Sequence, residues 1–530
     1  MPWREIVEFI STTEKMIVKT RCAAVMGLEA TIVSIEVSIT KGVMFHLTGL
    51  ADTAVKESKD RIMAALTNNG FRLPPSDITI NMAPADIRKE GSGYDLSLAV
   101  ALLAAIGKIT REDLDEWMLI GELGLDGRLQ PIKGTLPIAI KARAKKMKGM
   151  IVPAQNINEA AVVNNLNVYG METLMDVVNF FNGNNDIQPT AIDTRRQFYE
   201  QQTQSELDFA DVKGQEEVKR ALEVAAAGGH NLMMIGPPGS GKSMMAKRLP
   251  SILPPLSLAE SLETTQIHSV AGKLPRGTSL ITQRPFRAPH HTISPVALVG
   301  GGNNPQPGEI SLAHNGVLFC DELPEFNRSA LEVMRQPLED RIITISRSKY
   351  SVEFPCSFMF VASMNPCPCG YYGDPTHHCV CSPGQIQRYM NKISGPLLDR
   401  IDIQCEISAI PFKDLSQAKR GEPSAAIRER VIAARQIQAQ RYAHIKGIHC
   451  NAQMTERLLH QYAQPDAPSL DMLRMAMERL KLSARAYSRI LRVARTIADL
   501  AGSEKVESMH IAEAIGYRNL DRGDWAERGI

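Results

Sequence analysis

One short segment of the chain combines glycines, a lysine and a hydroxyl at the spacing of a phosphate-binding loop. It spans residues 236–243 and matches the pattern G-x-x-x-x-G-K-[ST]. In such a loop the backbone N–H groups surround the phosphates, the lysine reaches the β- and γ-phosphates, and the hydroxyl binds Mg²⁺. The sequence therefore predicts an ATP and Mg²⁺ site formed by Gly236, Pro237, Pro238, Gly239, Ser240, Gly241, Lys242 and Ser243.

Two adjacent carboxylates and one amide further along the chain supply side chains that ATP hydrolysis needs. Asp321 and Glu322 follow the apolar residues 316–320, a pattern that predicts a buried strand. In P-loop ATPases such an aspartate binds Mg²⁺, and such a glutamate polarises the attacking water. Asn365 ends a second apolar run, 358–364, and is placed to orient the same water. A simple turn cap is the alternative role for this asparagine.

A cation must also stabilise the charge on the transferred phosphoryl group, and a neighbouring subunit can supply it. Arg400 is the candidate, in the charged sequence Leu-Leu-Asp-Arg-Ile-Asp that ends at Asp402. A salt bridge at a helix end, with Asp399 or Asp402, explains the same spacing equally well. The sequence alone leaves both roles open for Arg400.

Four of the nine cysteines follow soon after Asn365: Cys367, Cys369, Cys379 and Cys381. Four thiolates can form a closed tetrahedral Zn²⁺ site, and His377 or His378 is an alternative ligand. Free thiols in a loop and a redox disulfide are the other interpretations. An odd number of cysteines in so long a chain argues against a general disulfide framework. A metal at this position would brace the edge of the ATP site.

The composition is that of a soluble globular protein of several domains. The chain has 530 residues, of which 44% are hydrophobic and 22% charged, and a net charge of +2. A nucleic-acid-binding surface would therefore have to be a local basic patch. No apolar run is long enough to span a bilayer, and the first residues lack the apolar core of a secretory signal. We expect a cytoplasmic protein without a membrane partner, which starts at Met1 or Met16.

Changes in hydrophobic pattern divide the chain into an α/β block, an α/β nucleotide-binding block and a helical block. Strands are predicted at 30–39, 78–82 and 117–121, and helices at 53–69, 96–106, 424–442, 469–480 and 484–500. The predicted domains are an N-terminal extension (1–15), a first α/β domain (16–184), a polar linker (185–206), an ATPase core (207–408) with a cysteine-rich insertion (366–382), and a helical lid (409–530).

Residues 343–354 alternate between apolar and polar side chains around a short basic centre, which predicts a β-hairpin. Arg347 and Lys349 at its tip are candidates for contacts with DNA phosphates in a central channel. An ordinary basic turn is the alternative. Residues 287–302, which include His290 and His291, are a candidate for a second pore loop, and the two histidines could bind a metal or simply form hydrogen bonds.

Three further runs make the overall pattern specific. They are Pro285-Phe-Arg-Ala-Pro-His290-His291, Pro307-Gly-Glu-Ile-Ser-Leu-Ala-His314 and Asp321-Glu-Leu-Pro-Glu-Phe326. Together with the phosphate-binding loop they resemble the ComM/YifB family of magnesium-chelatase-like AAA+ ATPases, over nearly the whole chain. The resemblance implies an AAA+ α/β/α core with a helical lid, a homo-hexameric ring, and a helicase that promotes branch migration and integration of DNA in natural transformation. A chelatase-type remodeller of a protein or metal complex is the alternative function.

The same resemblance implies roles for single residues. Asn365 would be the sensor 1 residue, and Arg400 would be an arginine finger that acts on the neighbouring subunit. Arg485, in Ser483-Ala-Arg485, would be the sensor 2 residue that touches the γ-phosphate. Because several arginines share the predicted helix of Arg485, a solvated basic face is the alternative.

Residues 89–96 and 127–134 resemble the Lon protease domain, which implies a Lon-protease-like α/β fold for the first block. Lon-type proteolysis needs a serine with a lysine as its base. Gly93 stands where the serine belongs and Leu136 where the lysine belongs, and no single shift brings Ser92 and Lys133 into both positions. We therefore expect a non-proteolytic module for assembly or DNA contact, and disfavour an ATP-dependent protease.

Overall fold

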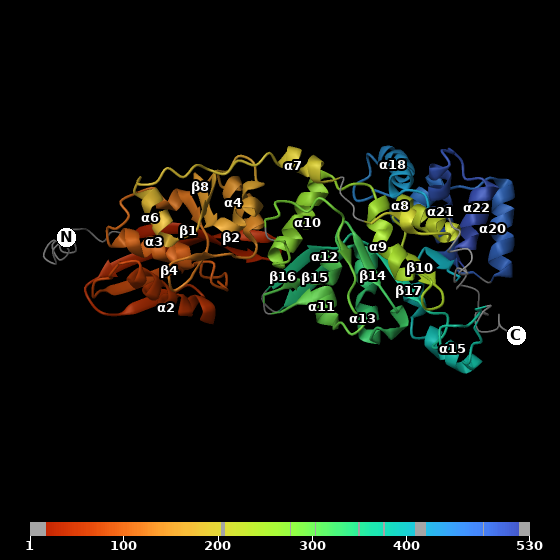
Figure 1. Cartoon of the computed structure of the whole chain (residues 1–530), viewed down its shortest axis with the longest axis horizontal. Helices are drawn as coiled ribbons and strands as arrows, with labels where there is room; N and C mark the ends of the chain where they lie inside the picture. Colours follow the sequence, from red (N-terminus) through yellow and green to blue (C-terminus); the bar gives the residue numbers. More distant parts are fainter. Residues whose placement is uncertain are drawn as a thin grey trace. The chain divides into compact units, whose positions relative to one another are not determined.

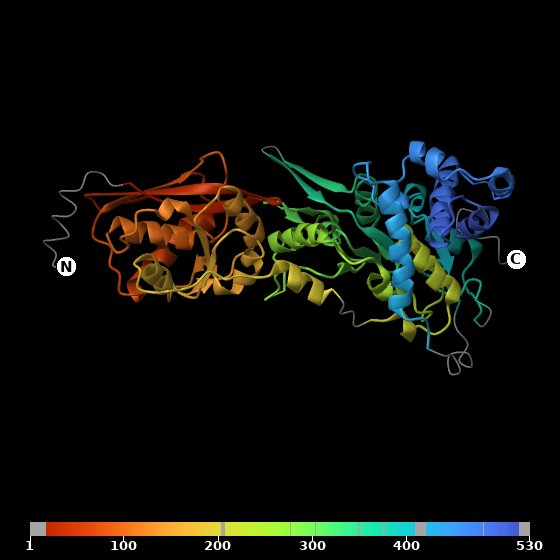
Figure 2. The ribbon, with the colours of Figure 1, turned by 90° about the horizontal axis from the view of Figure 1, so that it is seen from above.

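A computed structural model of the chain describes residues 17–202, 207–275, 277–302, 304–347, 350–374, 377–408, 420–480 and 482–518. These residues form two compact units, and each is described by itself. The first unit lies within Met1–Gln201, Leu258–Ile281 and Gly302–Pro307, and the second within Gln202–Ser257, Thr282–Gly301 and Gly308–Ile530 (Figures 1 and 2).

The first unit is built on a seven-stranded mixed sheet in the order β3-β4-β2-β1-β5-β8-β9. Its strands are β1 (Val18–Met26), β2 (Glu29–Thr40), β3 (Phe45–Thr48), β4 (Asp77–Ala83), β5 (Trp117–Leu119), β8 (Gly149–Pro153) and β9 (Val168–Met171). β1 and β2 form an antiparallel hairpin that runs from the Val18–Val37 pair to the Met26–Glu29 pair. The strands predicted at 30–39, 78–82 and 117–121 are confirmed as β2, β4 and β5.

Helices cover this sheet, and the one predicted at 96–106 lies deepest. The helices of the unit's first part are α2 (Thr53–Asn68), α3 (Asp95–Ala105), α4 (Thr135–Ala144), α5 (Ile157–Ala161), α6 (Leu174–Phe181) and α7 (Thr194–Gln201). α3 packs on β1 and β2, and its residues from Asp95 to Leu103 are all buried. Most of its side chains are apolar on every side of the helix, as expected for a buried helix. The predicted helices at 53–69 and 96–106 are confirmed as α2 and α3.

A later segment of the chain, Leu258–Ile281, completes the first unit. Helix α10 (Leu258–Val270) packs against α4 (Figure 1), and the Gly134 N–H donates to the Ser269 carbonyl at 3.1 Å. The Ser269 hydroxyl donates at 2.5 Å to Glu159, a carboxyl whose pKa is raised by burial. The predicted ATPase core at 207–408 includes these residues, whereas in the structure they belong to the first unit.

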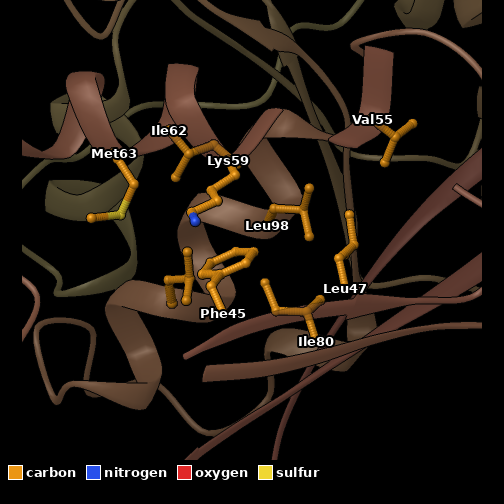
Figure 3. Close-up of a pocket in the computed structure, with 9 residues that line it drawn as sticks. Phe45, Leu47, Val55, Lys59, Ile62, Met63, Ile80 and Leu98 are labelled. Atoms are coloured by element: carbon orange, nitrogen blue, oxygen red, sulfur yellow. The ribbon is translucent and has the colours of Figure 1, made fainter. Parts of the chain in front are cut away.

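The first unit also contains an apolar pocket between α2, α3 and the strands β3 and β4 (Figure 3). Its lining consists of Phe45, Leu47, Val55, Lys59, Ile62, Met63, Ile80, Leu98 and Leu102. The Lys59 ammonium lies 5.0 Å from the centre of the Phe45 ring, and the other lining side chains are apolar. Lys59 is therefore the one ionisable side chain among the lining residues.

The second unit is built on a five-stranded parallel sheet in the order β11-β14-β17-β10-β18. Its strands are β11 (Phe286–Arg287), β14 (Val317–Cys320), β17 (Met359–Met364), β10 (Leu232–Ile235) and β18 (Ile403–Glu406). β10, β14 and β17 are buried along their whole length, as expected for a parallel sheet covered on both faces. Because the strands are parallel, the residues that follow them meet at one edge of the sheet.

Helices surround this sheet and extend into the C-terminal part of the chain. They are α8 (Glu216–Gly228), α9 (Lys242–Ile252), α11 (Pro295–Val299), α12 (Glu309–Leu312), α13 (Arg328–Val333), α14 (Arg335–Asp340), α15 (Pro383–Met390), α16 (Gly395–Leu398), α18 (Ser424–Arg441), α19 (Glu456–Tyr462), α20 (Ala467–Arg479), α21 (Ala484–Leu500) and α22 (Ser508–Gly516). α18 packs on α8, α9 and α21 (Figure 1), so the C-terminal helices and the sheet share one hydrophobic core. The helices predicted at 424–442, 469–480 and 484–500 are confirmed.

A buried ion pair holds the C-terminal helices together. Arg441 on α18 binds Asp499 on α21 at 2.6 Å, and Arg495 binds the same carboxylate at 2.9 Å. A buried charge needs such partners because desolvation is costly.

None of the helices among the described residues is long and apolar enough to cross a membrane.

Candidate nucleotide-binding site

The predicted phosphate-binding loop lies between β10 and α9, which begins at Lys242. Gly239 and Gly241 have φ angles of +76° and +90°, a backbone conformation that favours glycine. A Cβ on Gly236 would lie 2.3 Å from the Ile407 carbonyl oxygen, so the loop fits against its neighbour only with glycine there. The helix N-terminus faces the loop and favours an anion at this place.

Lys242 connects the loop to Asn365. Its Nζ donates to the Gly236 and Pro237 carbonyls at 2.7 and 2.8 Å and to Asn365 Oδ1 at 3.2 Å. Burial lowers the pKa of Lys242, and the nearby charge of Asp321 opposes that shift. Phosphate oxygens can replace the loop carbonyls as acceptors, so the ammonium is already close to where a nucleotide would bind.

The two predicted Mg²⁺ ligands are in direct contact. The Ser243 hydroxyl donates at 2.6 Å to Asp321 Oδ2, and Asp321 Oδ1 accepts hydrogen bonds from Ser363 and, at 3.1 Å, from the Glu322 N–H. A hydroxyl and a carboxylate at the same point are oxygen ligands of the kind that Mg²⁺ prefers. Sequence reasoning missed Ser363, although it is a polar residue within the apolar strand β17.

Glu322 has an unusual backbone and a histidine neighbour. Its φ and ψ are 53° and 52°, a left-handed conformation that is rare for a residue other than glycine and that often marks a functional site. Its Oε2 lies 3.7 Å from His291 Nδ1, and the rings of His290 and His291 lie 4.1 Å apart. The structure thus places the predicted second pore loop beside the carboxylate that would polarise water.

The described contacts of Arg400 and Arg485 are with other elements than the phosphate-binding loop. Arg400 forms an ion pair with Glu339 and donates to the Arg335 carbonyl at 3.1 Å. Arg485 binds Asp399, the residue next to Arg400, at 2.8 Å, and its side chain is 70% exposed. Among the contacts described for the chain, none joins either arginine to Lys242, Asp321, Glu322 or Asn365.

The salt bridge of Arg400 with Asp399 or Asp402, considered above, is not among the described ion pairs, because both aspartates pair with other residues. Asp399 pairs with Arg485, and Asp402 pairs with Arg489 at 2.6 Å and with His230 at 3.2 Å. The neighbouring Arg489 and His230 hold the pKa of the buried Asp402 carboxyl well below its usual range, although desolvation opposes this. Both aspartates are thus occupied by other residues, and the partner of Arg400 is Glu339.

Asn231, which sequence reasoning missed, connects three strands to Arg400. Its Nδ2 donates to the Arg400 carbonyl at 2.8 Å, and its Oδ1 accepts from the Phe360 N–H, at the start of β17, at 2.9 Å. Its own carbonyl accepts from the N–H groups of Asp402 and Ile403 at 3.0 Å. The only signal in the sequence was a polar residue immediately before the apolar strand β10.

We expect Asn231→Ala to lower ATP turnover by about tenfold and leave ATP affinity within about twofold of wild type, because a displacement near 1 Å of a catalytic group is costly. The substitution removes the bond that fixes the Arg400 carbonyl but touches no predicted phosphate ligand. Steady-state ATPase rates and binding of a fluorescent ATP analogue measure the two effects. The exposed Asn391→Ala is the control, and unchanged turnover in Asn231→Ala would contradict a role for this residue.

The four predicted cysteines converge in one cluster. Their sulfur atoms all lie within 4.8 Å of one another, and the Sγ atoms of Cys367, Cys369 and Cys379 are 3.3 to 3.7 Å apart. All nine cysteines are free, so the disulfide interpretation does not apply to this structure. Within the described residues the group of side chains that could hold a metal ion consists of these four cysteines, and His377 stacks on Tyr371 instead.

The environment of the cluster favours a thiolate at one position. Burial would raise the pKa of the Cys369 thiol, but hydrogen bonds from the backbone N–H groups of Tyr371 and Val380 outweigh it and lower the pKa to about 6. Burial raises the pKa of the neighbouring Cys379 and Cys381 thiols. The thiolate is the form of cysteine that binds metals.

The predicted hairpin is confirmed as β15 (Ile342–Arg347) and β16 (Tyr350–Pro355), which pair from Ile342–Pro355 to Arg347–Tyr350. The Arg347 side chain is exposed. Lys349, the other predicted DNA contact, lies outside the described residues.

The region that resembles the Lon protease site has no serine–lysine pair. Leu136 is fully buried, and a Cβ on Gly93 would contact the Ile132 side chain at 3.7 Å. The Ser92 hydroxyl donates to Glu122, and the Lys133 stem packs on Gly272. These positions therefore cannot supply the nucleophile and base of Lon-type proteolysis.

Comparisons with known proteins cover nearly the whole chain. The family model described as magnesium chelatase, subunit ChlI, matches residues 208–415. A second, described as subunit ChlI of Mg-chelatase, matches residues 35–156, and a third, for the ChlI C-terminal part, matches residues 421–518.

Individual relatives extend this similarity. The competence protein ComM of Haemophilus influenzae is 44% identical over 501 residues, which are 94% of this chain and 97% of the relative. The uncharacterized protein YifB of Escherichia coli is 42% identical over 509 residues, 96% and 97% of the two chains. Lon protease 2 of Bacillus subtilis is 31% identical over 159 residues, 27% of each chain.

Proposed function

The chain belongs to the ComM/YifB family of magnesium-chelatase-like AAA+ ATPases, and from this premise we propose that it is an ATP-driven motor acting on DNA. It works as a cytoplasmic homo-hexameric helicase that promotes branch migration and integration of DNA in natural transformation and recombination. The observation that carries the proposal is the 44% identity to the competence protein ComM over 94% of the chain. The first unit would serve as a non-proteolytic module for assembly or DNA contact.

Hydrolysis uses groups that the structure already holds close together. Lys242 exchanges its loop carbonyls for the β- and γ-phosphates, and Ser243 and Asp321 would hold Mg²⁺. The metal neutralises charge on the phosphate oxygens when it is bound. Glu322 accepts a proton from the attacking water, and Asn365 orients that water.

The remaining cation comes from the next subunit in the ring. Arg485 pairs with Asp399, the residue before Arg400, and the described contacts of both arginines are with other elements than the phosphate-binding loop of the same chain. An arginine finger supplied in trans stabilises the transition state and makes hydrolysis depend on assembly. Support for a shared site thus comes from the described contacts of Arg400, which are with Glu339 and the Arg335 carbonyl.

DNA would contact the basic tip of the β15–β16 hairpin and the loop of His290 and His291. The second contact matters because His291 lies 3.7 Å from Glu322. DNA that displaces this histidine would change the surroundings of the catalytic carboxylate, and the ATPase rate would respond to DNA.

We expect single-stranded DNA to stimulate the ATPase, with an apparent DNA affinity that falls steeply as salt is raised. Arg347→Glu should weaken the stimulation and reduce the salt slope by about one for each lost phosphate contact. The matched control is Arg474→Glu, another exposed arginine on a different element. If DNA does not stimulate the wild-type ATPase and does not bind it in a salt-sensitive way, the DNA proposal is wrong.

A chelatase-type remodeller is the second candidate, because all three matching family models describe magnesium chelatase. This function predicts an ATPase that does not respond to DNA. The DNA stimulation assay therefore separates the two candidates directly.

A further inference from the structure

The cysteine-containing loop between β17 and α15 rests directly on the phosphate-binding loop. Gly370 follows Cys369, has a φ of +91° and donates its N–H to the Cys367 carbonyl at 3.0 Å. A Cβ on Gly370 would lie 2.6 Å from Pro238 Cδ and 3.9 Å from Asn365 Cγ. The backbone turn from Cys367 to Gly370 is therefore next to two predicted parts of the nucleotide site.

The spacing of the sulfur atoms fits a tetrahedral metal site. Ligands at the usual Zn–S distance of about 2.3 Å lie roughly 3.8 Å apart around a tetrahedron. The Sγ atoms of Cys367, Cys369 and Cys379 are 3.3 to 3.7 Å apart, close to that value and far above the S–S bond length of about 2.05 Å in a disulfide. The Cys381 sulfur lies within 4.8 Å of the other three. Four sulfurs without a further ligand correspond to a closed structural site rather than a catalytic one.

We propose that these four cysteines bind one structural Zn²⁺ and that the metal-closed loop holds Pro238 and Asn365 in the arrangement that accepts ATP. The second part of this inference rests on the proposed ATP site. The physical reason is that the loop brings cysteines from two separate pairs together, and a metal removes the conformational freedom that they would otherwise keep. Cys367 is buried and only two residues from Asn365. Loss of the metal would therefore free the cysteine-containing loop that packs against Pro238 and Asn365.

The first test is elemental analysis of the chelator-washed, reduced full-length protein. We expect about one zinc per chain in wild type and in Cys22→Ser, a buried cysteine outside the cluster. The double variant Cys379→Ser/Cys381→Ser should retain less than about a tenth of that zinc. Wild-type protein that holds no zinc overturns the proposal.

The second test compares two glycines of the same loop. Gly370→Ala keeps all four cysteines but forces a methyl group against Pro238, whereas a Cβ on Gly373, which also has a positive φ of +77°, would meet nothing within 4 Å. Both variants share backbone strain, so the difference between them reports the contact alone. We expect both to keep zinc, and Gly370→Ala to bind a fluorescent ATP analogue about tenfold more weakly than Gly373→Ala.

The outcomes separate this inference from the proposed function. Equal ATP affinity in the two variants, with zinc retained, overturns the link between the loop and the nucleotide site. Removal of zinc by a stronger chelator should weaken ATP binding, and added Zn²⁺ should restore it. Zinc-loaded wild-type protein that binds no ATP contradicts the proposed ATPase instead, while its zinc content stands as an independent result.

Discussion

Arg400→Ala is expected to lower ATP turnover by at least about 10³-fold while ATP affinity stays within about twofold of wild type, because an arginine finger acts on the transition state. In the structure the Arg400 side chain binds Glu339 and the Arg335 carbonyl. The cation that contacts the phosphate-binding loop of the same chain is Lys242. Removing the guanidinium should thus leave the binding of ATP to that loop intact. The control is Arg474→Ala, which removes an exposed arginine paired with Asp471.

Mixing two inactive variants tests whether the arginine acts in trans. Lys242→Ala removes the ammonium from its own nucleotide site but keeps Arg400, whereas Arg400→Ala keeps the nucleotide site. In mixed rings a Lys242→Ala subunit can offer its arginine to an Arg400→Ala neighbour, so part of the ATPase activity should return. No recovery in mixtures that assemble normally would refute the trans assignment.

The same mixture isolates the role of Asn231. Adding Asn231→Ala to the Lys242→Ala subunit, which donates the arginine, should reduce the recovered activity. Adding it to the Arg400→Ala subunit, which receives the arginine, should have a smaller effect. Equal effects in the two positions would mean that Asn231 supports its own nucleotide site rather than Arg400.

Glu322→Gln is expected to lower turnover by roughly 10²- to 10³-fold with ATP and Mg²⁺ still bound, because an amide cannot take a proton from the attacking water. The Glu322 side chain points to His291 and makes no contact with Ser243 or Asp321, the predicted Mg²⁺ ligands, in the described interactions. Nucleotide affinity should therefore change little. Asp321→Asn, by contrast, should weaken Mg²⁺-dependent binding itself.

Single-turnover hydrolysis with prebound ATP measures the chemical step apart from binding. The control is Glu325→Gln, an exposed glutamate in the turn after Glu322 that pairs with Lys392 at 3.2 Å. A wild-type rate in Glu322→Gln would assign the proton acceptor to another residue. A loss of ATP affinity equal to the loss of turnover would give Glu322 a binding role instead.

The strands and helices of the chain follow from local patterns in its sequence. β2 and β4 alternate because one of their faces packs on the core, and α21 shows the helical repeat because it buries one side against α18 and α8. The phosphate-binding loop is likewise local, since its glycines, lysine and serine are consecutive. Such features depend on near neighbours, so the residue types alone determine them.

Tertiary structure decided which distant residues share a site and which do not. The contacts of Asn231 with Arg400 and Phe360, of His291 with Glu322, and of Gly370 with Pro238 join positions far apart in sequence. It also placed α10 in the first unit and set Arg485 beside Asp399. Sequence patterns cannot give such pairings, because they depend on strand order and helix packing, which bring residues together without leaving a periodic signal.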